Sequence, residues 1–204
     1  MSSSWDESRR AYRDAAEWFV ATVGQVCGRW DAPGLGDWDV RALVGHTSRA
    51  FLTVESYLAR PAADVAVPTA VAYYRATSAA AAGPAVAMRG REAGAALGAD
   101  PAISVAAIAA RVLQLVGERN GTELVTTIAG GMRLADYLPT RTFELAVHTA
   151  DLATALGMPP EVPSTAAAQA LHLTADLAVV TGRAGPLLLA ATGRAGLPPG
   201  FSLL

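Results

Sequence analysis

The sequence predicts a mainly α-helical protein, most simply a helix bundle with a small inserted β-hairpin and a short C-terminal helical extension. Apolar residues recur at helical spacing through most of the 204 residues, and proline or glycine clusters separate these stretches. One stretch instead shows two short apolar runs beside a glycine pair, which is typical of a hairpin. Hydrophobic residues make up 52% of the chain, enough for a packed core and too many for a disordered protein.

The first half of the chain is expected to supply the first bundle helices. Residues 3–29 place aromatic and apolar side chains at helical spacing, from Trp5 to Val23, and a turn cluster at 31–36 ends this helix. Asp39 is a suitable N-cap for a second helix that runs to about Leu58. An Ala-rich helical region follows Pro68, with a break expected at Gly83-Pro84. Pro101 then begins a helix that extends to about Arg119.

Residues 123–137 are expected to form the hairpin, with strands at 124–128 and 132–134 and a turn at Gly130-Gly131. Pro139 is expected to open a long helix that ends near Leu156, before Gly157 and Pro159-Pro160. Ser164 is expected to cap a later helix that reaches about Thr181, and a short helix follows at 186–192. We therefore expect a bundle at residues 1–160 and a helical extension at 161–204 packed on it.

Charge and hydropathy exclude several function classes. Sixteen basic residues face eighteen acidic ones, and the net charge of −2 leaves no basic patch of the kind that binds nucleic acid. The uncharged run at residues 76–88 is shorter than the roughly 18 residues that span a membrane. The N-terminus lacks the apolar segment of a signal peptide. We expect a cytoplasmic monomer or homodimer that binds neither nucleic acid nor a membrane.

The chemistry is concentrated in the helix expected after Pro139. Arg141, Glu144, His148 and Asp151 fall within roughly 80° of arc on that helix, since each residue advances about 100°. The rest of the helix surface is mostly apolar, and a helix that is apolar nearly all round is normally buried. Four buried ionisable groups are costly unless they are paired or bind a metal.

Glu144 and His148 are four residues apart and could share a cation such as Zn²⁺. A third ligand must come from elsewhere. His46, on the shoulder of the second helix's apolar stripe, is the better candidate, whereas His172 fits a surface or core position. Each of these residues also has a purely structural interpretation. His46 alone fits a core histidine, and Glu144 and His148 fit a structural pair. Arg141 and Asp151 fit a structural ion pair.

The single cysteine excludes internal disulfides and cysteine-rich metal sites. Cys27 falls beside Val23 and Val26 in the first predicted helix, so we expect a small buried side chain there, with a reactive thiol as the alternative.

Two sequence elements resemble a known family. Trp38 to His46 is similar to the W-x-V-x-x-L-x-x-H element of DinB-like proteins. The pattern Arg141-x-x-Glu144-x-x-x-His148-x-x-Asp151-Leu resembles the second element of the mycothiol-dependent maleylpyruvate isomerase branch of these proteins. Residues 132–141 and the C-terminal segment also resemble the corresponding segments of actinobacterial members of that branch. The chain departs at Ala42, where many relatives carry Asp, and its C-terminal part is short beside that of the true isomerase.

The resemblance implies a DinB-like four-helix bundle in residues 1–160, a divalent metal, usually zinc, held by His46, Glu144 and His148, and mycothiol as cosubstrate. The three ligands would leave one position open, where a thiol would bind as thiolate and attack an electrophile, either to transfer the thiol or to isomerise a double bond. Arg141 would bind a substrate carboxylate or pair with Glu144, and Asp151 would orient His148. The alternatives are a hydrolase that uses metal-bound water and a non-catalytic bundle that binds a metal or small molecule.

Overall fold

The computed structural model describes residues 4–78 and 84–204, which form eight helices and one two-stranded antiparallel hairpin. This confirms the predicted mainly α fold. The elements, in chain order, are α1 (Trp5–Val23), α2 (Val40–Leu58), α3 (Ala70–Thr77), α4 (Pro84–Ala96), α5 (Pro101–Gly117), β1 (Leu124–Thr127), β2 (Gly130–Arg133), α6 (Leu134–Ala155), α7 (Ser164–Val180) and α8 (Ala184–Ala191).

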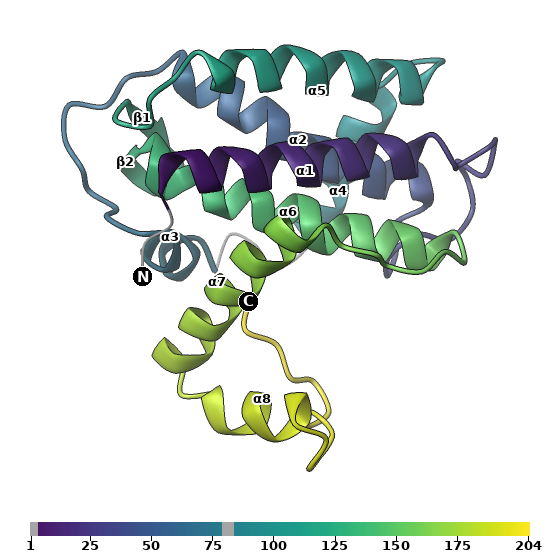
Figure 1. Ribbon diagram of the computed structural model, residues 1–204. Coiled ribbons are helices and arrows are strands. Elements are labelled where there is room, and N and C mark those ends of the chain that lie inside the picture. Colours follow the sequence, from purple (N-terminus) through teal and green to yellow (C-terminus); the bar gives the residue numbers. More distant parts are fainter. Residues whose placement is uncertain (1–3, 79–83) are drawn as a thin grey trace.

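Four long helices form the bundle, in which α1 packs against α6 and α5, and α2 also packs against both (Figure 1). Each contributes fully buried side chains to one core, among them Tyr12, Phe19, Phe51, Val112 and Leu145. Burying one such large side chain stabilises the fold by about 1.5–3 kcal/mol. Because α6 also packs against α7, it is enclosed on most sides, as its apolar composition predicts.

The first helix is shorter than the sequence predicts. It ends at Val23 rather than near Arg29: the Gln25 and Val26 amides turn back to the Thr22 and Val23 carbonyls, and Cys27 (φ 47°) and Gly28 (φ 83°) then adopt left-handed conformations, so no helix continues to Arg29. Cys27 is therefore an exposed loop residue, and the prediction that it is a buried helical side chain is wrong. The N-cap prediction for α2 is confirmed, since the Asp39 side chain accepts a hydrogen bond from the Ala42 amide at 2.7 Å.

The hairpin is confirmed, but its turn lies at Ile128 and Ala129, and Gly130-Gly131 begin the second strand. Gly131 is needed there because the preceding chain passes against it: the Asp64 carbonyl fills the space that a Cβ would occupy. The Ala66 and Val67 amides both donate to the Gly131 carbonyl at 2.9 Å. The glycine pair therefore allows the segment around Asp64 to pass close to the strand, and it does not form the turn.

Helix α6 begins at Leu134, five residues before the predicted start, and Pro139 lies inside it. The loop before the hairpin stabilises this early start, because the Leu134 amide donates to the Glu123 carbonyl and the Ala135 amide to the Gly121 carbonyl. These bonds satisfy amides of the first turn, which have no partner inside a helix.

The remaining boundaries differ by smaller amounts. Pro163, not Ser164, is the N-cap residue of α7, and α8 begins two residues before Pro186. The Ala-rich region forms α3 and α4; the predicted break involves Gly83, which lies outside the described residues.

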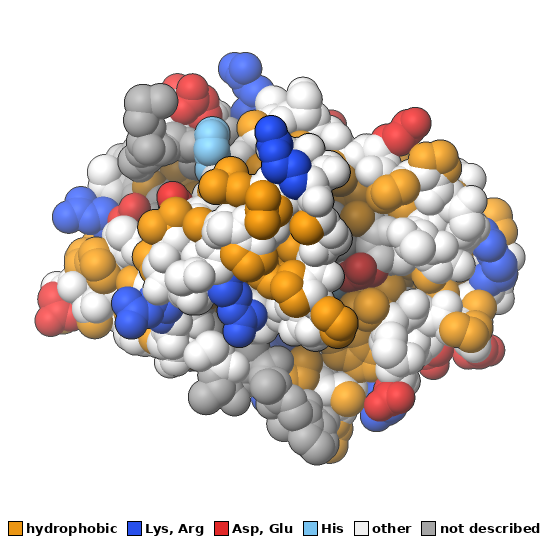
Figure 2. Space-filling view, turned by 90° about the horizontal axis from the view of Figure 1, so that it is seen from below, with side chains coloured by type: hydrophobic (Ala, Val, Ile, Leu, Met, Phe, Trp, Pro, Cys, Tyr) orange, Lys and Arg blue, Asp and Glu red, His pale blue; other side chains and the backbone are white. Residues whose placement is uncertain are grey.

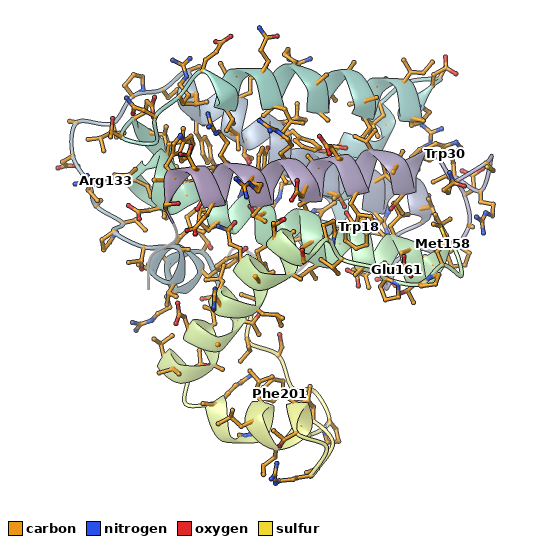
Figure 3. All side chains as sticks on the ribbon, viewed as in Figure 1. Trp18, Trp30, Arg133, Met158, Glu161 and Phe201 are labelled. Atoms are coloured by element: carbon orange, nitrogen blue, oxygen red, sulfur yellow. The ribbon has the colours of Figure 1, made fainter. Side chains whose placement is uncertain are left out.

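The C-terminal extension is attached through α7, which packs on α1 and α6. The buried Gln169 amide donates to the Ser8 hydroxyl at 3.0 Å, and Thr165 donates to Asp14. Helix α8 packs against α7 and contains no buried residue, and Arg183 lies over the ring of Phe201, 5.8 Å from its centroid (Figure 3). The division of the chain between residues 160 and 161 stays a prediction.

Apolar side chains are numerous on the face of the molecule that includes this extension (Figure 2). The exposed large apolar residues of α7, α8 and the following segment are Leu171, Val179, Val180, Leu188, Leu189, Leu197 and Leu204. Across residues 4–78 and 84–204, no single helix is long and apolar enough to cross a membrane; Val86–Ala96 and Pro101–Gly117, bent by 97°, meet that criterion only together, by length and composition.

Candidate metal centre

Helices α2 and α6 bring together the three predicted ligands. His46 comes from α2 and Glu144 and His148 from α6, and one candidate ligand atom from each lies within 4.8 Å of the other two. The imidazole rings of His46 and His148 are 4.9 Å apart and nearly perpendicular, and His148 Nε2 lies 3.3 Å from Glu144 Oε2. A cation bound among these atoms would have two nitrogen ligands and one oxygen ligand.

His46 supplies the observation that best tests the fit of a metal. Its Nδ1 is buried and has no hydrogen-bond partner among the described residues. A buried polar atom without a partner is costly, and a cation would satisfy it. Burial and the neighbouring His148 lower the pKa of His46 to about 4, so the ring is neutral at pH 7 and can donate a lone pair.

The indole of Trp38 orients His46 and is itself held by α4. The indole of Trp38 lies 4.5 Å from the imidazole, centroid to centroid, and its Nε1 donates to the Ala87 carbonyl of α4 at 3.1 Å. Gly90 of α4 lies so close to the indole that a Cβ there would be 2.8 Å from the ring. Helix α4 therefore positions the histidine ligand through Trp38.

Glu144 is held as a carboxylate. The Tyr74 hydroxyl of α3 donates to its Oε1 at 2.7 Å, and Arg141 Nη2 lies 3.9 Å from the same oxygen. Burial alone would raise the pKa of Glu144, but the hydrogen bond from His148 and the charge of Arg141 lower it to about 2. Glu144 is therefore ionised and available to a cation.

His148 is fixed between two carboxylates. Its Nδ1 lies 3.1 Å from Asp151 Oδ2, which leaves Nε2 directed toward Glu144. Burial opposes the charged ring, yet the bonds to Asp151 and Glu144 raise the pKa of His148 to about 9. A carboxylate behind a ligating imidazole is a common partner in metal sites, because it sets the tautomer and the ring orientation.

Arg141 is buried between aromatic rings. Its guanidinium carbon lies 5.1 Å from the centroid of Tyr137 and 5.5 Å from that of Tyr73, and its Nε donates to the Thr140 hydroxyl. The rings offer cation–π contacts, and Glu144 offers the nearest opposite charge. This placement agrees with pairing to Glu144. Binding of a substrate carboxylate by Arg141 stays a prediction.

Sequence reasoning missed Tyr73, Tyr74 and Tyr137 as neighbours of the site. No local motif predicts these three residues, because Tyr73 and Tyr74 reach the cluster from α3 and Tyr137 reaches it from the first turns of α6. The other two residues singled out from the sequence lie elsewhere: His172 is exposed on α7, and Cys27 is exposed in the loop after α1.

Comparison with known proteins gives one match. The family model described as mycothiol maleylpyruvate isomerase N-terminal domain matches residues 9–153. That range includes the bundle helices, the hairpin and all three candidate ligands. No curated protein and no solved structure shows a significant match.

Proposed function

The chain belongs to the family of the mycothiol maleylpyruvate isomerase N-terminal domain, and from that premise we propose that it is a metal-dependent enzyme with mycothiol as cosubstrate. The reaction is transfer of the thiol to a small electrophile, or isomerisation of a double bond through a thiol adduct. The cation is divalent, most simply Zn²⁺. The enzyme acts in the cytoplasm, where a low-molecular-weight thiol stays reduced.

The observation that supports this proposal is the convergence of His46, Glu144 and His148, of which His46 has a buried Nδ1 without a hydrogen-bond partner among the described residues. Two imidazoles and a carboxylate suit Zn²⁺, and three protein ligands are typical of catalytic zinc sites. A bound cation would stabilise the thiolate form of a thiol at the remaining coordination position. Cys27 is exposed in a loop outside the cluster, which fits an external thiol.

The protein's own side chains then have distinct tasks. Asp151 accepts from His148 Nδ1 and keeps the other nitrogen directed at the cluster. Tyr74 holds one oxygen of Glu144, and the second oxygen faces His148. Arg141 keeps net charge near zero around an ionised Glu144. These residues preorganise the ligands, so little reorganisation is required when the cation binds.

The electron movements of the two reactions are simple. In transfer, the thiolate forms a carbon–sulfur bond as the electrophile's leaving group departs with the bonding pair. In isomerisation, the thiolate adds to an activated double bond, and the π electrons move onto the conjugated carbonyl. Rotation about the resulting single bond and expulsion of the thiolate restore the double bond in the other geometry and regenerate the thiol.

The decisive experiment supplies zinc-loaded protein with mycothiol and, separately, maleylpyruvate and the alkylating agent monobromobimane. We expect product formation faster than the uncatalysed reaction, and this excess rate should require both zinc and mycothiol. It should be lost in His148→Ala and kept in the matched variant His172→Ala. Turnover that proceeds without any thiol would contradict the proposal in favour of hydrolysis. Absence of turnover in fully metallated protein would favour a binding role.

A further inference from the structure

A pocket of about 440 Å³ lies between α2, α4 and the tip of the hairpin, and none of the three metal-ligand candidates lines it. Helix α2 supplies Arg49 and Thr53, the segment just after α2 supplies Arg60, α4 supplies Arg89, and Ile128 reaches the pocket from the hairpin turn. The volume is within the range of small-molecule sites.

Two of the arginines, Arg49 and Arg60, line one side of the pocket, and Glu92 of α4 is the carboxylate among its lining residues. The guanidinium of Arg60 is ordered, because it lies 5.1 Å from the centroid of the Tyr57 ring and donates to the backbone and hydroxyl oxygens of Ser56. A guanidinium held in this way is suited to a carboxylate, which it can bind with two parallel hydrogen bonds.

The walls are partly apolar. Leu52 and Ile128 line the pocket and are 37% and 68% exposed, so their apolar surface is accessible to a bound molecule. The pocket therefore offers apolar contact beside positive charge, and this combination favours an organic anion over a bare inorganic one.

The pocket is built on the same face of α2 as the metal centre. His46, Arg49 and Thr53 fall within about 60° of arc on α2, and Arg49 lies only about 4.5 Å along the helix axis from His46. Thr53 is fixed from behind, since the buried Tyr137 hydroxyl donates to it at 2.9 Å. The near end of the pocket therefore lies on a rigid, hydrogen-bonded surface.

We propose that this pocket binds an organic carboxylate, with its carboxyl group at Arg49 and Arg60 and its apolar body against Leu52 and Ile128. The site is separate from the three metal ligands, and the proposal concerns binding alone. It stands or falls independently of the thiol chemistry.

Calorimetric titration with benzoate tests the proposal, with benzamide as a neutral probe of the same shape. We expect saturable benzoate binding to the metal-loaded protein. Arg49→Gln and Arg60→Gln should each weaken it about tenfold or more, the ratio expected for loss of a charge-assisted hydrogen bond. Benzamide and inorganic phosphate should each bind at least about tenfold more weakly than benzoate.

Arg13→Gln is the matched control, because it removes the same charge from an exposed position on α1. It should leave benzoate binding unchanged, and equal weakening by Arg13→Gln would overturn the site. Benzoate binding that disappears when the metal is chelated would place the carboxylate on the cation and also overturn it. Circular dichroism checks the fold. If Arg49→Gln does not fold, variants of the exposed Arg60 still test whether the pocket binds the carboxylate. Arg60→Gln removes the charge, and Arg60→Lys keeps the charge without the planar guanidinium.

Discussion

Helices α6 and α7 each carry a histidine followed within one turn by an aspartate, yet only one pair belongs to a site. On α6, His148 is enclosed by α2 and bonded to Asp151 and Glu144. On α7, His172 and Asp176 are exposed, and neither side chain makes a hydrogen bond or ion pair with another residue in the described ranges. The same local spacing therefore has different consequences because of what packs over it.

Enclosure changes the electrostatics as well as the contacts. Low-dielectric surroundings strengthen the attraction between the His148 ring and its carboxylates and penalise any unpaired charge. Exposed pairs at helical spacing contribute only a few tenths of a kcal/mol. The comparison predicts large effects for changes on α6 and small effects for the matching changes on α7.

The largest contrast is expected for removal of each histidine. His148→Ala should abolish stoichiometric zinc binding, because two protein ligands rarely hold zinc at a structured site. His172→Ala should keep about one zinc per chain. Elemental analysis of protein purified without a metal-affinity step measures both. Equal zinc content in the two variants would refute the ligand assignment, and loss only in His172→Ala would move the site to α7.

The aspartates should give the next largest contrast. Asp151→Asn preserves shape but removes the charge behind His148, and loss of such a partner typically weakens metal affinity or activity about 10–100-fold. Asp176→Asn, the matched change on α7, should leave affinity as in the wild type. Competitive titration with a chelator separates these outcomes. An Asp151→Asn affinity equal to that of the wild type would remove Asp151 from the site.

The pH dependence of metal binding sharpens the comparison further. In the metal-free protein the pKa of His148 is raised to about 9, so the ring is protonated at pH 7 and the metal must displace that proton. Apparent affinity should therefore rise about tenfold per pH unit between pH 6.5 and 9. The stability of the metal-free protein should depend on pH in the opposite direction. The raised pKa of His148 stabilises the metal-free fold below pH 6.5, and this contribution is lost as pH rises through 9.

Calorimetry in buffers of different ionisation enthalpy measures the proton released on zinc binding at pH 7. We expect about one proton in the wild type and in His172→Ala. Release of no proton, or an affinity that does not change between pH 6.5 and 8, would show that His148 is already neutral before the metal binds.

The smallest effect is expected outside both helices. Cys27→Ser changes an exposed loop side chain whose only described bond is a weak contact from Sγ to the Gly24 carbonyl at 4.0 Å. Turnover and metal content should be unchanged once any difference in folded fraction is corrected. A folded, zinc-loaded Cys27→Ser protein without activity would contradict the external-thiol mechanism.

The contents of α6 could be predicted because helical spacing fixes the angular relation of Arg141, Glu144, His148 and Asp151 without reference to the rest of the chain. The position of His46 opposite them could not follow from periodicity. It depended on a resemblance and on the scarcity of histidines. Tyr74 was missed for the same physical reason: it meets Glu144 across 70 residues of sequence, and only packing of α3 on α6 brings it there.

Local backbone conformation explains the errors in element boundaries. The apolar pattern of the first helix continues past Val23, but Cys27 and Gly28 have positive φ, which no periodicity reports. Gly130-Gly131 suggested a turn because glycine is common in turns. Glycine is instead required because the backbone at Asp64 passes against Gly131. The first error comes from local backbone conformation and the second from a tertiary contact, and apolar periodicity reports neither.

The close packing of α2 on α4 limits which residues the sequence tolerates between these helices. Beside the Gly90–Trp38 contact, α2 and α4 approach so closely that a Cβ on Gly45 would overlap the backbone of Gly94, and a Cβ on Gly94 would lie 2.6 Å from the Arg41 carbonyl oxygen. Two absent methyl groups therefore set the spacing of the helices that frame both His46 and the arginine-lined pocket. In a randomised library these two positions should admit almost nothing but glycine, although neither lies among the candidate metal ligands or the residues that line the pocket.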